Sequence, residues 1–259
     1  MDTIKKTPIT KLNKGDCINV MDDISDNSVD LILCDLPYGI TSCKWDSIIP
    51  FDCLWSHYKR IITQTGVIAL HASQPFTSAL VMSNPDMFRH EWIWIKNRGS
   101  NFANTVREPM KEHESILIFS YGKWTYNKQM QERTGGGLDR AKYLVNFNDQ
   151  NREAYKKFKP KKSNKITKLR VPSSWQKFNV EVGLHPTQKP IKLLEYLIKT
   201  YTDEDNWVLD NCMGSGSTGI ACLNTKRNFI GIEKEKKYFD IAQSRINEHR
   251  TILLEKNNV

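Results

Sequence analysis

Two short polar motifs, each directly after an apolar run of strand length, constrain this chain more than any other feature. The first, Asp35-Leu36-Pro37-Tyr38, follows Val29–Cys34, and the second, Asp210–Thr218, follows Trp207–Leu209. Short apolar runs that end at turn residues are typical of buried strands. In open α/β sheets, ligands bind at the carboxyl ends of the strands. The sequence therefore predicts that both motifs lie at the ligand-binding edge of a sheet.

The second motif carries a glycine turn, Gly214-Ser215-Gly216, followed by Ser217-Thr218. Small residues let the backbone approach a ligand closely, and a helix that follows offers unpaired amide groups. No lysine of the triphosphate-binding kind follows the glycines. Seventeen residues beyond Gly216, the apolar run 228–232 ends at Glu233, which can accept hydrogen bonds from two ribose hydroxyls. The pattern favours a cofactor that contains a nucleoside.

Each of these signals has a simpler explanation when taken alone. A glycine pair after a strand is more often a plain tight turn, and an acidic residue at a strand end is often only solvated. An Asp-X-Pro-Tyr sequence can form a type I turn in which proline presets the backbone. The conjunction of all three in one chain is therefore more informative than any one of them.

On these residues the chain resembles the permuted, β-type family of DNA amino-methyltransferases, in which Asp-Pro-Pro-Tyr precedes a recognition region and then the cofactor loop. The resemblance covers nearly the whole chain, and His185–Pro190 is its most specific further segment. The other matching segments are 14–17, 66–70, 91–96 and 113–119. The resemblance implies an α/β fold, namely the S-adenosylmethionine-dependent methyltransferase Rossmann-like fold. This fold has a mostly parallel seven-stranded sheet, here in circularly permuted motif order with an inserted basic target-recognition region.

The chain departs from the family pattern at two places. Leu36 replaces the first proline of the catalytic tetrapeptide, and 211–213 (Asn-Cys-Met) replaces the usual Pro-Phe-Ala before the glycines. The groups that carry the chemistry in the family, at Asp35, Pro37 and Tyr38, are all present. Because both loop glycines also remain, we expect the cofactor loop to keep its fold.

The resemblance implies roles for individual residues. Asp35 and the carbonyl oxygen of Pro37 would accept hydrogen bonds from an exocyclic amine, and Tyr38 would stack on a base flipped out of the duplex. S-adenosylmethionine would be held at its ribose by Glu233, at its adenine by Asp16 with the Cys17 backbone, and at its methionine part by the second motif. The residues assigned to the cofactor are Asp16, Cys17, Asp35, His185, Lys189, Asp210, Gly214, Ser215, Gly216, Ser217, Thr218 and Glu233.

The sequence favours the N6 amine of adenine as the methyl acceptor. In the family, an aspartate at the start of the tetrapeptide is more usual for adenine N6, and a serine is more usual for cytosine N4. The predicted function is therefore site-specific, adenine-specific DNA methylation. The alternatives are an N4-cytosine DNA methyltransferase, a catalytically silent DNA-binding protein of the same fold, and an enzyme that acts on RNA.

The positive charge of the chain is concentrated in one segment. Between Lys123 and Lys177 there are fifteen Lys or Arg against four Asp or Glu, whereas the net charge of the whole chain is +9. Aromatic residues are interleaved with these charges, as a polyanion with exposed bases requires. A solvated lysine-rich loop is the simpler alternative. We predict two halves of one methyltransferase domain, substrate half 1–122 and cofactor half 184–259, separated by a target-recognition region at 123–183 that binds double-stranded DNA.

The periodicity of the apolar residues predicts the remaining elements. Strands are expected at 17–20, 29–34, 66–70, 91–96, 114–120, 207–210 and 228–232, and helices at 51–62, 193–198 and 238–246. The sequence has no Cys-X-X-Cys or His-X-X-X-His pair, so we expect reduced cysteines and no metal site. It has no run of eighteen apolar residues and no apolar segment after the amino terminus, so we expect no membrane association and a cytoplasmic location. The resemblance also raises the expectation of a homodimer and of a separate restriction endonuclease as partner.

Overall fold

The computed structural model describes residues 7–39, 46–134, 168–181 and 188–257. The chain divides into two compact units, one formed by 1–127 with 174–259 and the other by 128–173. The second unit contains the antiparallel pair β6 (Gln131–Glu132) and β7 (Leu169–Arg170). It lies within the predicted recognition region 123–183, whose division from the two catalytic halves stays a prediction. The lysine cluster at 156–162 lies outside the described residues.

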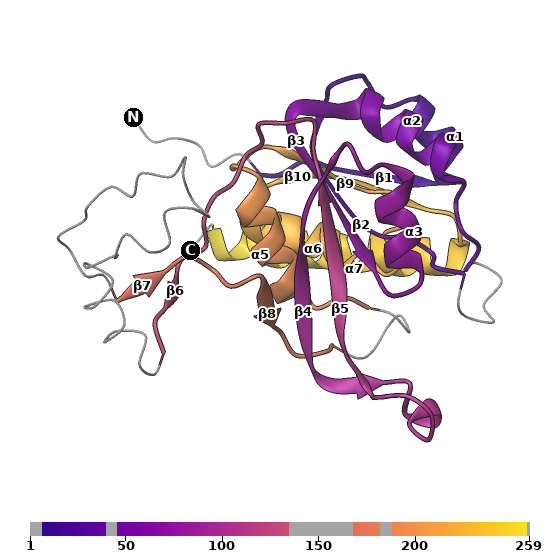
Figure 1. The fold of residues 1–259 in the computed structure, drawn as a ribbon. Coiled ribbons are helices and arrows are strands. Elements are labelled where there is room, and N and C mark those ends of the chain that lie inside the picture. The colour runs from indigo at the N-terminus through magenta and orange to yellow at the C-terminus, as the bar shows by residue number, and fades with distance from the viewer. Residues whose placement is uncertain (1–6, 40–45, 135–167, 182–187, 258–259) are drawn as a thin grey trace. The chain divides into compact units, whose positions relative to one another are not determined.

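The first unit is built on a mixed sheet with the strand order β1-β10-β9-β2-β3-β5-β4-β8 (Figure 1). Five strands, β1, β10, β9, β2 and β3, run parallel to one another. β5 is antiparallel to both β3 and β4, and β8 is parallel to β4. The bounds are β1 Thr10–Lys14, β2 Val29–Asp35, β3 Ile62–Ala72, β4 Phe88–Ser100, β5 Lys111–Phe119, β8 Trp175–Lys177, β9 Trp207–Asp210 and β10 Asn228–Glu233. The predicted α/β fold with a mostly parallel sheet is confirmed.

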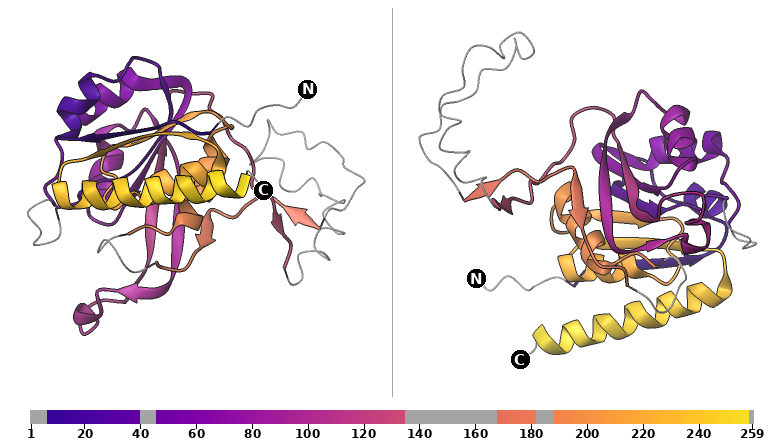
Figure 2. Two further views of the ribbon diagram at one scale, coloured as in Figure 1. Left: turned by 180° about the vertical axis from the view of Figure 1, so that it is seen from behind. Right: turned by 60° about the horizontal axis from the view of Figure 1, so that its bottom comes forward.

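Helices cover both faces of this sheet, and each face has its own apolar core. One core joins the sheet to α5, α6 and α7, and the other joins it to α1, α2 and α3. In Figure 2, α7 runs along one face of the sheet. The bounds are α1 Cys17–Asp22, α2 Phe51–Ile61, α3 Phe76–Ser83, α5 Ile191–Tyr201, α6 Ser217–Thr225 and α7 Lys236–Asn257, with a 3-10 turn η1 at Phe102–Asn104. None of the described helices is both long and apolar enough to cross a membrane.

The structure corrects two of the sequence predictions. The strand expected at 17–20 is wrong, because these residues form α1, whose first turn is capped by the Asp16 side chain accepting from the Ile18 amide at 3.1 Å. The first strand is instead β1, which is largely polar and pairs along only one side, so apolar alternation does not mark it. Among the described residues the sheet also has eight strands rather than the predicted seven, because the three-residue β8 adds to the edge of β4.

The permuted order of the motifs places their strands next to each other. Leu31 and Ile32 of β2 pair with Val208 and Leu209 of β9, across more than 170 residues of sequence. Because the pairing is parallel, the carboxyl ends of both strands reach the same edge of the sheet. The two polar motifs therefore meet at one place.

Candidate active site

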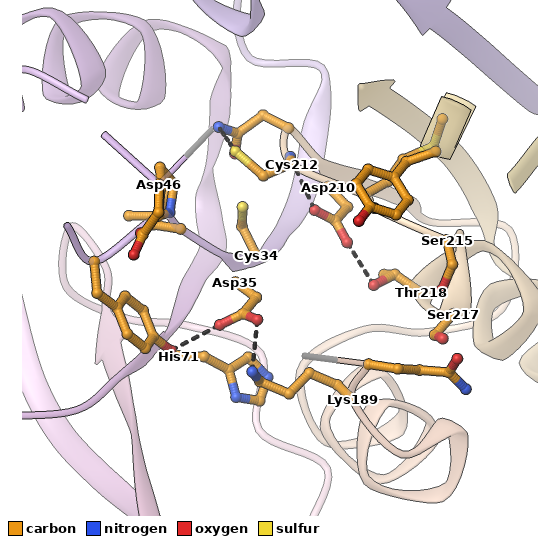
Figure 3. Close-up of a pocket in the computed structure, with 18 of the residues that line it drawn as sticks. Cys34, Asp35, Asp46, His71, Lys189, Asp210, Cys212, Ser215, Ser217 and Thr218 are labelled. Carbon is orange, nitrogen blue, oxygen red and sulfur yellow. Dashed lines mark hydrogen bonds and ion pairs between the residues drawn. The ribbon is translucent and has the colours of Figure 1, made fainter. Parts of the chain in front are cut away.

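A cavity of about 770 Å³ lies at the carboxyl ends of β2, β9 and β10, between the two motifs (Figure 3). Nearly all the predicted site residues line it. They are Asp16, Cys17, Asp35, Pro37, Tyr38, Lys189, Asp210, Gly214, Ser215, Ser217, Thr218 and Glu233. Gly216 belongs to the same turn without lining the cavity, and His185 lies outside the described residues. The structure thus brings the two halves of the predicted site together.

Asp35 is the last residue of β2, and both oxygens of its carboxylate are held. The Tyr38 hydroxyl donates to Oδ1 at 2.7 Å, and Lys189 Nζ donates to Oδ2 at 2.5 Å. The Tyr38 ring stacks against Phe76, with centroids 5.1 Å apart. Leu36 borders the cavity too, but its side chain is 4% exposed and belongs to the core on the side of α1, α2 and α3. This core position accounts for the leucine that replaces the first proline, because the substitution leaves the polar side of the motif unchanged.

The second motif forms a tight turn that leads into α6. Gly214 and Gly216 have φ angles of 51° and 81°, and a Cβ on Gly216 would lie 3.0 Å from the Cβ of Ala242. Both positions therefore require glycine. Asp210 stabilises the turn, because its carboxylate accepts hydrogen bonds from the Cys212 amide at 3.1 Å and from the Thr218 hydroxyl at 2.6 Å. Burial raises the pKa of Asp210 to about 7, although these hydrogen bonds act against the shift.

The residues that depart from the family pattern are anchored by partners within this chain. The buried Tyr58 hydroxyl donates to Asn211 Oδ1 at 2.6 Å. The Met213 side chain lies over Gly231, so closely that a Cβ there would meet its sulfur at 2.3 Å. Gly214 and Gly216 keep their left-handed backbone. The expectation that the loop keeps its fold despite these substitutions agrees with this geometry.

Two carboxylates from neighbouring strand ends face the same cavity. Glu233 accepts from the Gly214 amide at 2.9 Å and from the Glu235 amide at 2.8 Å, and burial raises its pKa. Asp16 caps α1 and also pairs with Lys234 at 3.1 Å, so it has a structural task in addition to any contact with a ligand.

The lining of this cavity fits a nucleoside cofactor that carries a carboxylate. Ser217, in the first turn of α6, has a buried hydroxyl with no hydrogen-bond partner among the described residues. A ligand that enters the cavity can satisfy this group, since a buried hydroxyl left unpaired is costly. The free amides of the first turn of α6 favour an anion, and Glu233 offers acceptors for hydroxyls.

Three ionisable residues that the sequence did not assign to the site lie beside Asp35. Lys96 Nζ donates to Glu114 Oε1 at 2.5 Å, and Lys189 approaches Glu114 Oε2 at 3.4 Å. His71 is the register partner of Asp35 on β3 and is 1% exposed, and neither ring nitrogen has a hydrogen-bond partner among the described residues. Burial lowers the pKa of His71 to about 4, and the nearby Lys189 adds to the shift. No spacing rule in the sequence indicates that these side chains turn inward.

The fold and the cavity together define an S-adenosylmethionine-dependent methyltransferase. The comparisons narrow this class: the family N6_N4_Mtase, described as DNA methylase, matches residues 29–244, and the chain belongs to that family. It is a DNA methyltransferase, and S-adenosylmethionine is its cofactor.

The chain is similar over most of its length to curated and structurally known DNA methyltransferases. It is 29% identical to the Type II methyltransferase M2.MboI of Moraxella bovis, across 93% of this chain and 88% of the relative. It is also 29% identical to M.HinfI of Haemophilus influenzae, across 91% and 67%. The M1.HpyAVI complex with S-adenosylmethionine superposes with a TM-score of 0.62 at 25% identity, across 92% and 100%. The cytosine-N4-specific PvuII DNA methyltransferase shares the fold, with a TM-score of 0.64 at 13% identity, across 98% and 97%.

Proposed function

We propose that this protein transfers a methyl group from S-adenosylmethionine to the N6 amine of an adenine in double-stranded DNA. The observation that carries the choice of base is the carboxylate of Asp35 at the opening of the catalytic tetrapeptide, held in the cavity by Tyr38 and Lys189. An aspartate at this position favours adenine in the family pattern. The Type II methyltransferases to which the chain is similar support DNA as the substrate.

The chemistry needs two hydrogen-bond acceptors at the amine. The lone pair of an exocyclic amine is delocalised into the base ring, so the amine is a poor nucleophile. Asp35 and the carbonyl oxygen of Pro37 would each accept one N–H, which localises the lone pair and opposes the positive charge that develops as the methyl group arrives. The held carboxylate needs little reorganisation at that moment. S-adenosylmethionine supplies the methyl group from its sulfonium, and in-line placement of donor and amine provides the remaining acceleration.

The target base must leave the duplex to reach Asp35, because the amine is inaccessible inside a stacked helix. Flipping costs a few kcal/mol in general. Tyr38 would stack on the base, and the basic segment 123–183 would contact the DNA. A homodimer and a separate restriction endonuclease, both raised by the resemblance to the family, stay proposals. The cytoplasmic location, which was expected from the sequence, stays a proposal as well.

The residues proposed to hold the cofactor divide by the part of the molecule they meet. Glu233 would bind the ribose hydroxyls, Asp16 and the Cys17 backbone the adenine, and Asp210 with the glycine turn the methionine part. His185 and Lys189 would approach the methionine carboxylate. Since Lys189 Nζ lies 2.5 Å from Asp35 Oδ2, a contact of the same ammonium with the cofactor would place the catalytic carboxylate and the cofactor carboxylate around one charge.

Nucleoside analysis of methylated DNA tests this proposal. The purified protein is incubated with S-adenosylmethionine and mixed-sequence duplex DNA, the DNA is digested to nucleosides, and both methylated products are sought by mass spectrometry. N6-methyldeoxyadenosine is the expected product. N4-methyldeoxycytidine would retain the mechanism and overturn the choice of base, in line with the fold shared with a cytosine-N4-specific enzyme. The absence of both products, with no cofactor binding, would favour a catalytically silent DNA-binding protein.

A further inference from the structure

Four neighbouring strands each carry an ionisable side chain beside the cavity, on the same face of the sheet. On each strand the alternate residues are apolar and belong to the core under α5 and α6, until the last position before the cavity. The series are Leu31, Leu33, Asp35 on β2; Val67, Ala69, His71 on β3; Ile118, Ile116, Glu114 on β5; and Trp92, Trp94, Lys96 on β4. Successive side chains of a strand alternate between faces, so these four ionisable groups cap one apolar layer.

Lys189, just before α5, joins this layer to form a continuous chain of charges. Lys96 contacts Glu114 at 2.5 Å, Glu114 contacts Lys189 at 3.4 Å, and Lys189 contacts Asp35 at 2.5 Å. The side chains of the two lysines are 9% exposed, that of Glu114 is 16% exposed and that of Asp35 is 22% exposed. The chain contains two positive and two negative charges. Removing any single member therefore leaves an unbalanced charge, whereas removing one lysine together with one carboxylate does not.

We propose that Lys96, Glu114 and Lys189 are positioning residues that hold the Asp35 carboxylate in the geometry needed for methyl transfer. The inference rests on the proposed function, because it assigns Asp35 to the amine. It also gives a role to two segments of the family pattern that have none so far, 91–96 and 113–119, because Lys96 and Glu114 lie beside Lys189. Each contributes one charge to the chain.

The environment of Glu114 supports a tightly coupled arrangement. Burial alone would raise the pKa of this carboxyl, yet the nearby Lys189 and Lys96 lower it to about 2. Burial would lower the pKa of Lys189, and Asp35 and Glu114 reverse this and raise it. Two other titratable groups face these charges. His71 is neutral at pH 7, and burial raises the pKa of Tyr38, so neither adds a charge. Glu114 therefore stays ionised and keeps Lys189 directed at the catalytic carboxylate.

Charge balance distinguishes this proposal from a purely structural role, because lost packing in a single variant would not be restored by a second substitution. Glu114→Gln leaves two lysines facing one carboxylate, whereas Lys96→Met combined with Glu114→Gln leaves the Lys189–Asp35 pair alone and neutral. Removing one partner of a buried pair is much more damaging than replacing both. We therefore expect Glu114→Gln to lower kcat by a factor of about ten or more, and the double variant to recover most of that loss. The KM for S-adenosylmethionine should change less than about twofold, because neither residue is assigned to the cofactor.

Glu91→Gln is the matched control, because Glu91 is an exposed glutamate on β4, outside the chain of charges. Methyl transfer to duplex DNA is measured for the wild type, the control and the two variants. A double variant as slow as Glu114→Gln, or a Glu114→Gln enzyme as fast as the control, overturns the proposal.

Carbon NMR of the glutamate carboxyls separates this inference from the proposed function. The Glu114 signal, assigned by its loss in Glu114→Gln, should not titrate between pH 4 and 7 in the wild type, and Lys96→Met should move its titration upward. If the wild type methylates neither base, the proposed function fails, yet this titration still tests the interactions among the four charged side chains. A Glu114 carboxyl that titrates between pH 4 and 7 in the wild type contradicts the proposal in either case.

Discussion

Two buried groups on different strands should make opposite contributions to the pH dependence of stability. Burial raises the pKa of Asp210 from 3.8 to about 7, and burial together with Lys189 lowers the pKa of His71 from 6.5 to about 4. The two pH windows overlap almost completely. In the wild type the two contributions to the free energy of unfolding therefore largely cancel between pH 4 and 7. Removing either group should make the contribution of the other measurable.

The sign of each contribution follows from proton binding in the folded and unfolded states. Between pH 3.8 and 7, Asp210 is protonated in the folded protein and ionised in the unfolded chain, so its contribution falls as pH rises. Between pH 4 and 6.5, His71 is neutral in the folded protein and protonated in the unfolded chain, so its contribution rises with pH. Each pKa unit corresponds to about 1.4 kcal/mol, which gives a loss of about 4 kcal/mol for Asp210 and a gain of about 3 kcal/mol for His71.

Urea unfolding followed by tryptophan fluorescence from pH 4 to 7 tests this for Asp210→Asn and His71→Gln. The free energy of unfolding of Asp210→Asn, relative to the wild type, should increase by about 4 kcal/mol over this range, and that of His71→Gln should decrease by about 3 kcal/mol. Any constant packing cost of a substitution cancels in this slope. Asp52→Asn, at an exposed position of α2, is the control. Variant profiles that run parallel to the wild type would refute the assigned pKa values.

Two further predictions concern the cofactor side of the cavity. Glu233→Gln should weaken S-adenosylmethionine binding by a factor of about ten or more, since hydrogen bonds to a charged acceptor contribute about 1.5–3 kcal/mol. Calorimetry measures the affinity, with Glu248→Gln at an exposed position as the control. Equal affinities of the two variants would remove Glu233 from the site. Gly216→Ala should lower the free energy of unfolding by about 1–3 kcal/mol because of its positive φ and the 3.0 Å approach to Ala242. Gly122→Ala, where a Cβ meets nothing within 4 Å, should be nearly neutral in the same urea unfolding, and equal losses in both variants would contradict this reasoning.

The sequence predicted those parts of the fold whose apolar pattern has a clear period. The strand at 207–210 agrees with β9, and the helix at 51–62 agrees with α2 to within one residue. The segment 17–20 was misassigned because Ile18 and Val20 alternate like a short strand, while the capping side chain of Asp16 determines the helix. β1 was missed because an edge strand with polar residues has little apolar alternation to detect.

The sequence predicts the site residues that belong to the two motifs, but not the contacts between those residues and the rest of the chain. Asp35, Asp210 and Glu233 each end an apolar strand, so their meeting at one edge follows from the topology of a parallel sheet. The contact between Lys189 and Asp35 joins residues 154 positions apart and depends on how α5 packs, which a single sequence does not encode in any local pattern. The sequence does not indicate a role for Glu114 either, because nothing local distinguishes it from an exposed glutamate near the end of a strand.

The central claim is that Asp35 holds the N6 amine of adenine for methyl transfer from the sulfonium of S-adenosylmethionine. Transfer of a deuterium-labelled methyl group tests this claim most directly. Wild type and Asp35→Ala are incubated with the labelled cofactor and duplex DNA, and the nucleosides are weighed by mass spectrometry. We expect labelled N6-methyldeoxyadenosine from the wild type and none from the variant, while both proteins bind the cofactor. Labelled deoxycytidine from the wild type, or labelled deoxyadenosine from Asp35→Ala, would contradict it.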